Sequence, residues 1–130
     1  MTRRFSNRRK IVNEASVIGL MDYLNIRIID IENFSFQEIV SVFNGTTHLI
    51  SIHGAGLTNM IFMEKGSSVF ELLLENTLTD KCYYFLANAS ELNYSYQLCK
   101  SKNDIKDHIY VDLIVDIDLL KTNLIRFLSS

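Results

Sequence analysis

Residues 48–74 read HLISIHGAGLTNMIFMEKGSSVFELLL, and this stretch decides the fold. A β-rich segment, 48–52, stops at the turn His-Gly-Ala-Gly of 53–56. A short apolar helix pattern, 57–63, follows at once, and a second apolar strand covers 69–74. α/β proteins build anion sites from a strand, a glycine turn and a helix start, because glycine lets the backbone approach a ligand and the helix offers unpaired N–H groups. The stretch therefore predicts an α/β fold with a ligand contact at this turn.

The remaining chain alternates between helical and strand periods. Apolar residues at a spacing of three and four predict helices, and runs rich in β-branched residues predict strands. The expected helices carry the apolar runs Val17 to Leu24, Phe36 to Phe43, Cys82 to Ala89 and Leu120 to Leu128, and the expected strands are Ile26 to Ile31, His48 to Ile52, Ser68 to Leu74, Tyr94 to Leu98 and Ile109 to Leu113.

Several helix ends carry recognisable signals. Ser35 and Glu38 have the spacing of a capping box, and Phe34 and Ile39 that of a hydrophobic staple. Gly45 is expected at the left-handed position after the same helix. Asn13 is expected to cap the first helix and Asp116 and Asp118 the last one.

Alternating β and α segments favour a Rossmann-like parallel sheet with helices on both faces. The continuous apolar strands agree, because such strands are buried on both sides. In open sheets of this kind, ligands bind outside the carboxyl ends of the strands. The turn at 53–56 lies at such an end, and Glu71 lies toward the end of the following strand.

Length and composition bound the class of protein. The 130 residues form one domain, 1–130, and a hydrophobic content of 48% with a formal charge of -2 fits a soluble globular protein. This charge gives no reason to expect nucleic acid or an anionic membrane as a partner. The apolar runs are too short to cross a bilayer, so no membrane segment is expected in this chain.

No cofactor or metal site is expected. Cys82 and Cys99 make neither a disulfide framework nor a metal-ligand spacing, and they are interpreted as buried or half-buried thiols. Asp116-Ile117-Asp118 has the letters of the Asp-x-Asp metal motif, but it lies at the start of the last helix, far in sequence from the glycine turn.

The central stretch resembles the signature of glycosyltransferase family 61. The matching residues are HGAGLTN at 53–59, then Gly66, then Glu71 in the next strand. Upstream, a basic segment of 3–10 precedes Asn13-Glu14, as in that family. The seven-residue run is specific, whereas the basic segment alone would be weak.

The resemblance implies a fold and a reaction. The family has the two-domain GT-B fold, and this chain resembles its C-terminal, donor-binding half. The implied enzyme transfers a sugar from a nucleotide-sugar donor, expected to be UDP-linked, to a hydroxyl of a glycan or protein acceptor, with inversion and without an essential metal. The general base is expected in the missing N-terminal half of the same enzyme, so this fragment alone is expected to be inactive.

The resemblance also implies which residues bind the donor. Arginines of the basic segment, Arg3 and Arg9 first, would pair with the diphosphate, because a guanidinium binds two oxygens at once; a solvated segment is the alternative. His53 would donate to the leaving group or position the glycines. The expected donor-binding residues are Arg3, Arg9, His53, Gly54, Ala55, Gly56, Thr58, Asn59 and Glu71.

Three of these residues also have plainer interpretations. Thr58 and Asn59 could cap the short helix instead of reaching a phosphate or ribose. Glu71 lies in an apolar strand, where a carboxylate needs a partner. That partner is expected to be a ribose hydroxyl, with an ion pair to an N-terminal arginine as the alternative.

Two further expectations concern the whole protein. In the family a strand leads into the position of Arg3, whereas only Met1 and Thr2 precede it here, so the sheet is expected to lack its first strand. The alternative to an enzyme is a non-catalytic α/β remnant that binds a nucleotide or a protein. The compartment would be the cytoplasm for a bacterial protein and the endoplasmic reticulum or Golgi lumen for a eukaryotic one.

Overall fold

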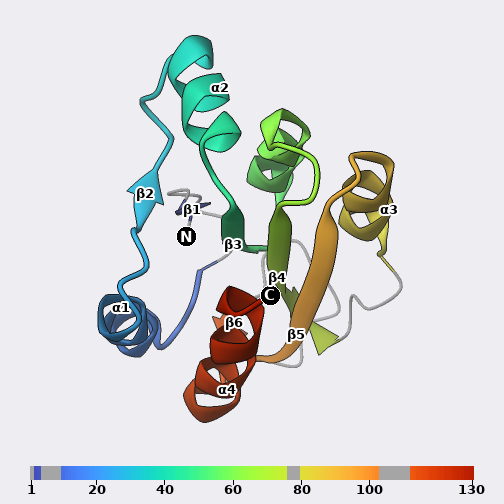
Figure 1. The fold of residues 1–130 in the computed structure, drawn as a ribbon. Coiled ribbons are helices and arrows are strands. Elements are labelled where there is room, and N and C mark those ends of the chain that lie inside the picture. Colours follow the sequence, from blue (N-terminus) through green and yellow to red (C-terminus); the bar gives the residue numbers. More distant parts are fainter. Residues whose placement is uncertain (1, 4–9, 76–79, 103–111) are drawn as a thin grey trace.

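The computed structural model describes residues 2–3, 10–75, 80–102 and 112–130, with the first pair described by its backbone alone. Helices and strands alternate along the chain from β1 to β5, and β6 and α4 follow (Figure 1). Their order is β1 Thr2–Arg3, α1 Glu14–Tyr23, β2 Ile29–Asp30, α2 Phe36–Asn44, β3 His48–Ile52, the 3-10 helix η1 Ala55–Phe62, β4 Ser68–Leu74, α3 Cys82–Ala89, β5 Asn93–Ser101, β6 Leu113–Ile114 and α4 Ile117–Leu128.

The central sheet has the order β3-β4-β5-β6. The first three strands are parallel, with Ser51 opposite Glu71 and Glu71 opposite Tyr96. The two-residue strand β6 pairs antiparallel with β5, so the expected parallel sheet is in fact mixed.

A short parallel pair, β1 and β2, lies beside this sheet. Because β1 pairs with β2 and also lies against β3, the spatial order across both parts is β2-β1-β3-β4-β5-β6. This is the order of one common class of doubly wound α/β folds. The expectations of a missing first strand and of a GT-B half stay predictions.

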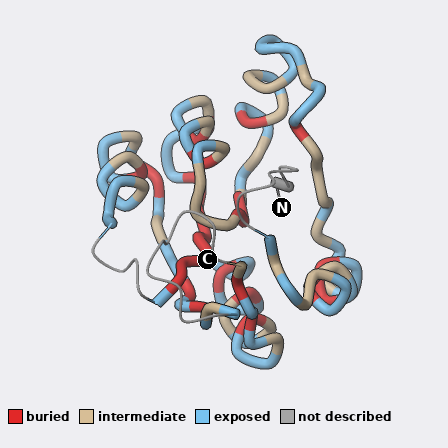
Figure 2. The backbone as a smooth tube through the Cα atoms, turned by 180° about the vertical axis from the view of Figure 1, so that it is seen from behind, coloured by how far each residue is buried: buried red, intermediate tan, exposed pale blue. Residues whose placement is uncertain are grey.

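Helices cover both faces of the sheet, as expected. Ile50, Phe70 and Leu72 pack in one apolar cluster with α1 and α4. Leu49 and Val69 pack in the other with α2, η1 and α3. All seven residues of β4 are buried, because both sides of this strand are covered. Figure 2 shows the same pattern, with buried segments gathered along the strands and on the inner sides of the helices.

The capping box is present: Ser35 accepts a hydrogen bond from the N–H of Glu38, whose side chain accepts one from the N–H of Ser35. Phe34 and Ile39, the two staple residues, both pack against the cluster under α2. Asp116 caps α4 by accepting a hydrogen bond from the N–H of Leu119, and the strands predicted for 48–52 and 68–74 have those bounds.

Two local expectations are wrong and two are met in altered form. Gly45 ends α2 with φ -82°, outside the left-handed region, because the chain leaves the helix through an ordinary turn. The side chain of Asn13 does not cap α1 but bonds both backbone groups of Val115, at 2.7 and 3.0 Å. The predicted strand 26–31 is present but shortened to Ile29–Asp30, and the predicted short helix is present as the 3-10 helix η1. The predicted strand 109–113 lies largely outside the described residues.

Among the described residues, no helix combines the length and apolar character needed to cross a membrane.

Candidate functional site

The glycine turn lies at the carboxyl end of β3. The backbone ladder continues one residue past the strand, since the N–H of His53 donates to the carbonyl of Leu72 at 2.9 Å. The chain then turns into η1, where the N–H of Leu57 donates to the carbonyl of Gly54. Leu57 and Met60 are fully buried and anchor η1 to the cluster beneath it. This anchoring holds the turn in place at the carboxyl end of β3.

The two glycines of the turn are not required by the packing of the described residues. A Cβ atom added at Gly54 or Gly56 would meet no described atom within 4 Å. Gly54 has φ 163°, extended backbone that other residues also adopt. The missing side chains therefore leave open space above the backbone, which is what a ligand in contact with that backbone needs.

Asn59 and Thr58 have partners inside η1 and α3. The side-chain amide of Asn59 donates to the carbonyl of Gly56 at 3.1 Å, so this side chain closes the first turn of η1. Thr58 hydrogen-bonds Tyr83, whose pKa is raised chiefly by burial. Neither contact is a helix cap, because no side chain caps the start of η1 at Gly54, so the capping interpretation is wrong. Contacts of both residues with a donor stay predictions.

Glu71 is buried in β4, with 1% of its surface exposed. Its Oε1 lies 2.5 Å from Nδ1 of His53, and its Oε2 accepts a hydrogen bond from the hydroxyl of Tyr94. Both carboxylate oxygens thus have partners, as a buried carboxylate requires. The contact with Glu71 and burial together raise the pKa of Tyr94, with burial the larger cause.

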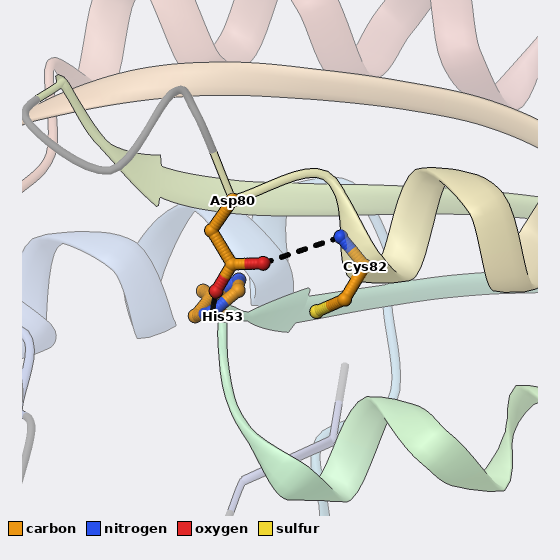
Figure 3. Close-up of side chains that lie close together, drawn as sticks. All are labelled: His53, Asp80 and Cys82. Carbon is orange, nitrogen blue, oxygen red and sulfur yellow. Dashed lines mark hydrogen bonds and ion pairs between the residues drawn. The ribbon is translucent and has the colours of Figure 1, made fainter.

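His53 uses its second ring nitrogen as well. Nε2 lies 3.2 Å from Oδ2 of Asp80, and the other oxygen of Asp80 accepts a hydrogen bond from the N–H of Cys82 at 3.2 Å (Figure 3). The ring of Tyr83 packs edge-on against the imidazole at 5.0 Å. Hydrogen bonds from Cys82 are the main reason why the pKa of Asp80 is lowered. A continuous polar chain therefore runs from Tyr94 to the start of α3.

The thiol of Cys82 lies beside this chain. Burial, followed by the hydrogen bond and charge of Asp80, raises the pKa of Cys82 to about 11. Nucleophilic cysteines need the opposite shift, because the thiolate is the reactive form. Cys82 is thus protonated at neutral pH and is not an activated nucleophile.

The structure gathers most of the sequence-predicted residues. His53, Gly54, Ala55, Gly56, Thr58 and Asn59 form one continuous segment, and Glu71 joins it through His53. Arg3 ends β1, which lies against β3, while its side chain and all of Arg9 lie outside the described residues. Lys10, the first described residue after this segment, donates its N–H to Asp112 beside β6.

Sequence reasoning missed Asp80, Cys82, Tyr83 and Tyr94 as part of this site. The one local signal was Asp80 two residues before an apolar helix pattern, where an aspartate accepts N–H groups of the first turn. Nothing local shows that this turn lies against His53. Tyr94 is found only from strand register: it is opposite Val69, which lies two residues before Glu71 and so on the same face of the sheet.

Comparisons with known proteins point to one family. The family model of Glycosyltransferase 61 matches residues 1–70, slightly more than half of the chain. The EGF domain-specific O-linked N-acetylglucosamine transferase of Mus musculus is 28% identical over 96 residues, which cover 70% of this chain and 18% of the mouse protein. The corresponding protein of Canis lupus familiaris is 27% identical over the same length.

A second kind of relative matches a shorter part. The protein O-linked-mannose beta-1,4-N-acetylglucosaminyltransferase 2 of Xenopus laevis is 39% identical over 70 residues, or 52% of this chain and 12% of the relative. The chain thus spans less than a fifth of the length of these relatives.

Proposed function

Because this chain belongs to glycosyltransferase family 61, we propose that it forms the nucleotide-sugar-binding part of an enzyme that transfers a sugar to a hydroxyl acceptor. The proposed donor is a UDP-sugar. The proposed reaction inverts the anomeric carbon and needs no divalent metal on the diphosphate. The acceptor-binding half of a GT-B fold, with its general base, would come from a part of the enzyme beyond this chain.

The observation that carries this proposal is the open glycine turn at the end of β3. In a doubly wound sheet, ligands bind at the carboxyl ends of the strands where the strand order reverses. Here the order reverses between β1 and β3, whose last residues are Arg3 and Ile52. The turn beginning at His53 follows directly, and its glycines leave space for a diphosphate against the backbone.

The proposed chemistry is electrostatic. A leaving diphosphate carries negative charge, which N–H donors at a helix start and arginine side chains can stabilise without a metal. In this proposal Arg3 and Arg9 supply the guanidinium groups, Gly54 to Gly56 supply the backbone, and Thr58 and Asn59 reach the phosphate or ribose.

His53 would donate a hydrogen bond to the leaving group from the edge of the turn. Glu71 supports this role, because its carboxylate holds Nδ1 and thereby fixes the direction of the ring. A direct contact between Glu71 and a ribose hydroxyl stays a prediction. Since both oxygens of Glu71 already have partners, the geometry supports it better as a residue that positions His53.

The names of the relatives suggest the first donor to test. Both kinds of relative are named as N-acetylglucosamine transferases. The name of one specifies EGF domains, and the name of the other specifies O-linked mannose on protein. We therefore propose UDP-N-acetylglucosamine as the first donor for this chain, and a hydroxyl on a protein or glycan as the acceptor.

Calorimetry with UDP tests the proposal. The wild-type chain should bind UDP and UDP-N-acetylglucosamine, with ADP as a comparison nucleotide. Gly56→Val should weaken binding at least about tenfold while thermal unfolding stays close to wild type, because the added side chain enters open space. The matched control is Gly19→Val, an equally open glycine on α1. No UDP binding at millimolar ligand, or equal binding by both variants, would contradict the proposal.

A further inference from the structure

Three side chains at the junction of β3 and α3 offer metal-ligand atoms to one another. His53 comes from the end of β3, and Asp80 and Cys82 come from the start of α3 (Figure 3). One ring nitrogen, one carboxylate oxygen and one sulfur lie within 4.8 Å of each other. We propose that His53, Asp80 and Cys82 form a zinc-binding site.

The spacing suits tetrahedral coordination. Zinc binds nitrogen and oxygen at about 2.0–2.2 Å, so two such ligands on a tetrahedron lie about 3.3 Å apart. The observed separation of Nε2 of His53 and Oδ2 of Asp80 is 3.2 Å. A sulfur ligand at about 2.3 Å needs a separation of roughly 3.6 Å from the others. The exposed side chain of Cys82 can close the remaining distance by a rotation about its own bonds.

The second nitrogen of His53 is held as it is in zinc proteins. A ligating histidine nearly always gives its other N–H to a carboxylate or carbonyl, which fixes the tautomer and the ring direction. Nδ1 of His53 lies 2.5 Å from Oε1 of the buried Glu71, and Tyr94 in turn holds Glu71. Zinc binding requires the ring proton to lie on Nδ1, so that the lone pair of Nε2 is directed at an ion held between Asp80 and Cys82.

The donor set selects the metal. A thiolate and an imidazole suit zinc, whereas magnesium, calcium and manganese prefer oxygen ligands. On binding, the thiol of Cys82 releases its proton to the buffer and its sulfur bonds the zinc. Any proton on Nε2 of His53 is released as well, and the contact between this nitrogen and Asp80 is replaced by one bond from each residue to the ion. Three protein ligands leave a fourth position for water or another oxygen.

The zinc site shares His53 with the proposed function, and zinc on Nε2 would take the nitrogen that otherwise donates to the leaving group, so the two roles of His53 are alternatives. The proposed sugar transfer needs no magnesium or manganese on the diphosphate, and the present donor set does not suit those ions. His53 belongs to both sites, but zinc binding can be measured without nucleotide or acceptor. A chain that binds zinc and not UDP would support the zinc site and reject the nucleotide proposal.

Cobalt(II), which replaces zinc and absorbs light when bound to thiolate, provides the test. The chelator-treated 130-residue chain should bind one cobalt ion and show a thiolate-to-cobalt absorption band, which one equivalent of zinc should remove. Cys82→Ser should abolish the band, and Cys99→Ser, which changes the buried thiol, should keep it. Glu71→Gln should retain the band but weaken affinity about 10–100-fold.

Two outcomes would overturn the zinc site. One is the absence of a thiolate band in wild-type chain, even if cobalt binds, because ions on surface carboxylates give none. The other is a band that survives in Cys82→Ser. Since Cys82 is exposed, its substitution by serine leaves the core intact and keeps the test decisive even if Glu71→Gln fails to fold.

Discussion

His53 and Glu71 are diagonal neighbours on one face of the sheet, with Nδ1 of the histidine 2.5 Å from Oε1 of the glutamate. Ser51 is opposite Glu71 in the parallel ladder, and residues two apart on a strand share a face. His53, two residues after Ser51, therefore projects on the same side as Glu71. The pairing register of β3 and β4 therefore places the two side chains next to each other.

Replacing Glu71 with glutamine should destabilise the fold. Glutamine keeps the shape of the side chain but replaces the carboxylate with a neutral amide. The NH2 group of that amide would face either His53 or Tyr94, where the wild-type protein has an accepting oxygen. The loss expected for a buried, charge-assisted hydrogen bond is about 1–3 kcal/mol in the free energy of unfolding. Urea denaturation of Glu71→Gln measures it.

The control for this prediction is Glu64→Gln, which changes an exposed glutamate before Gly66. An exposed substitution of this kind should stay within about 0.5 kcal/mol of wild type. If the two variants had the same stability, the contacts of Glu71 would contribute nothing to the fold.

Asp80 should make stability depend on acid pH. Its pKa is lowered from the ordinary value of 3.8, first by hydrogen bonds from Cys82. A lowered folded-state pKa stabilises the fold above the unfolded value, and this contribution disappears as pH falls through the folded value. Asp80→Asn should therefore melt below wild type at pH 6, and the two melting temperatures should converge below pH 3.8.

Asp22→Asn, on the exposed side of α1, controls for the loss of one negative charge. It should not reproduce the convergence. A constant difference between wild type and Asp80→Asn across this pH range would show that the carboxylate does not stabilise the fold through its charge.

Cys82 should react slowly with alkylating reagents although it is exposed. Its pKa is raised to about 11 by burial and by Asp80, so little thiolate is present at pH 8. Iodoacetamide should label it at least about tenfold more slowly than a free cysteine, and the rate should climb until about pH 11. Peptide mass spectrometry separates this cysteine from Cys99.

Asp80→Asn removes one of the causes of this shift, so it should speed the labelling of Cys82. Labelling at the rate of a free cysteine, unchanged in Asp80→Asn, would show that the carboxylate does not hold the thiol in its protonated form.

Local signals predicted the centre of the fold well. The strands around the glycine turn have the expected bounds, because a buried apolar run bounded by turn residues has few other conformations. The capping box of Ser35 and Glu38 is also local, since its two partners lie three residues apart. The seven-residue run at 53–59 supplied the family, which the family model confirms.

Contacts between distant residues were beyond prediction from one sequence. Asn13 was expected to cap its own helix, but Val115 lies close enough to take both groups of its side chain. Asp80, which precedes α3, meets His53 at the end of β3, and the two residues lie far apart in the sequence. The antiparallel pairing of β6 with β5 likewise joins residues that lie apart in the sequence. Neither the periodicity of apolar residues nor the spacing of a motif predicts such contacts between distant residues.

Two glycines should respond in opposite ways to alanine. Gly19 lies at an exposed position inside α1 with open space for a Cβ, so Gly19→Ala should stabilise the fold by about 0.5–1 kcal/mol through lower backbone entropy of the unfolded chain. Gly66 has φ +83°, where a Cβ is strained, so Gly66→Ala should destabilise it by about 1–2 kcal/mol, although space around it is equally open. Thermal unfolding of both variants under one condition measures the pair. Equal shifts of the same sign would mean that backbone conformation does not decide the response, and that the turn before β4 relaxes freely when Gly66 is replaced.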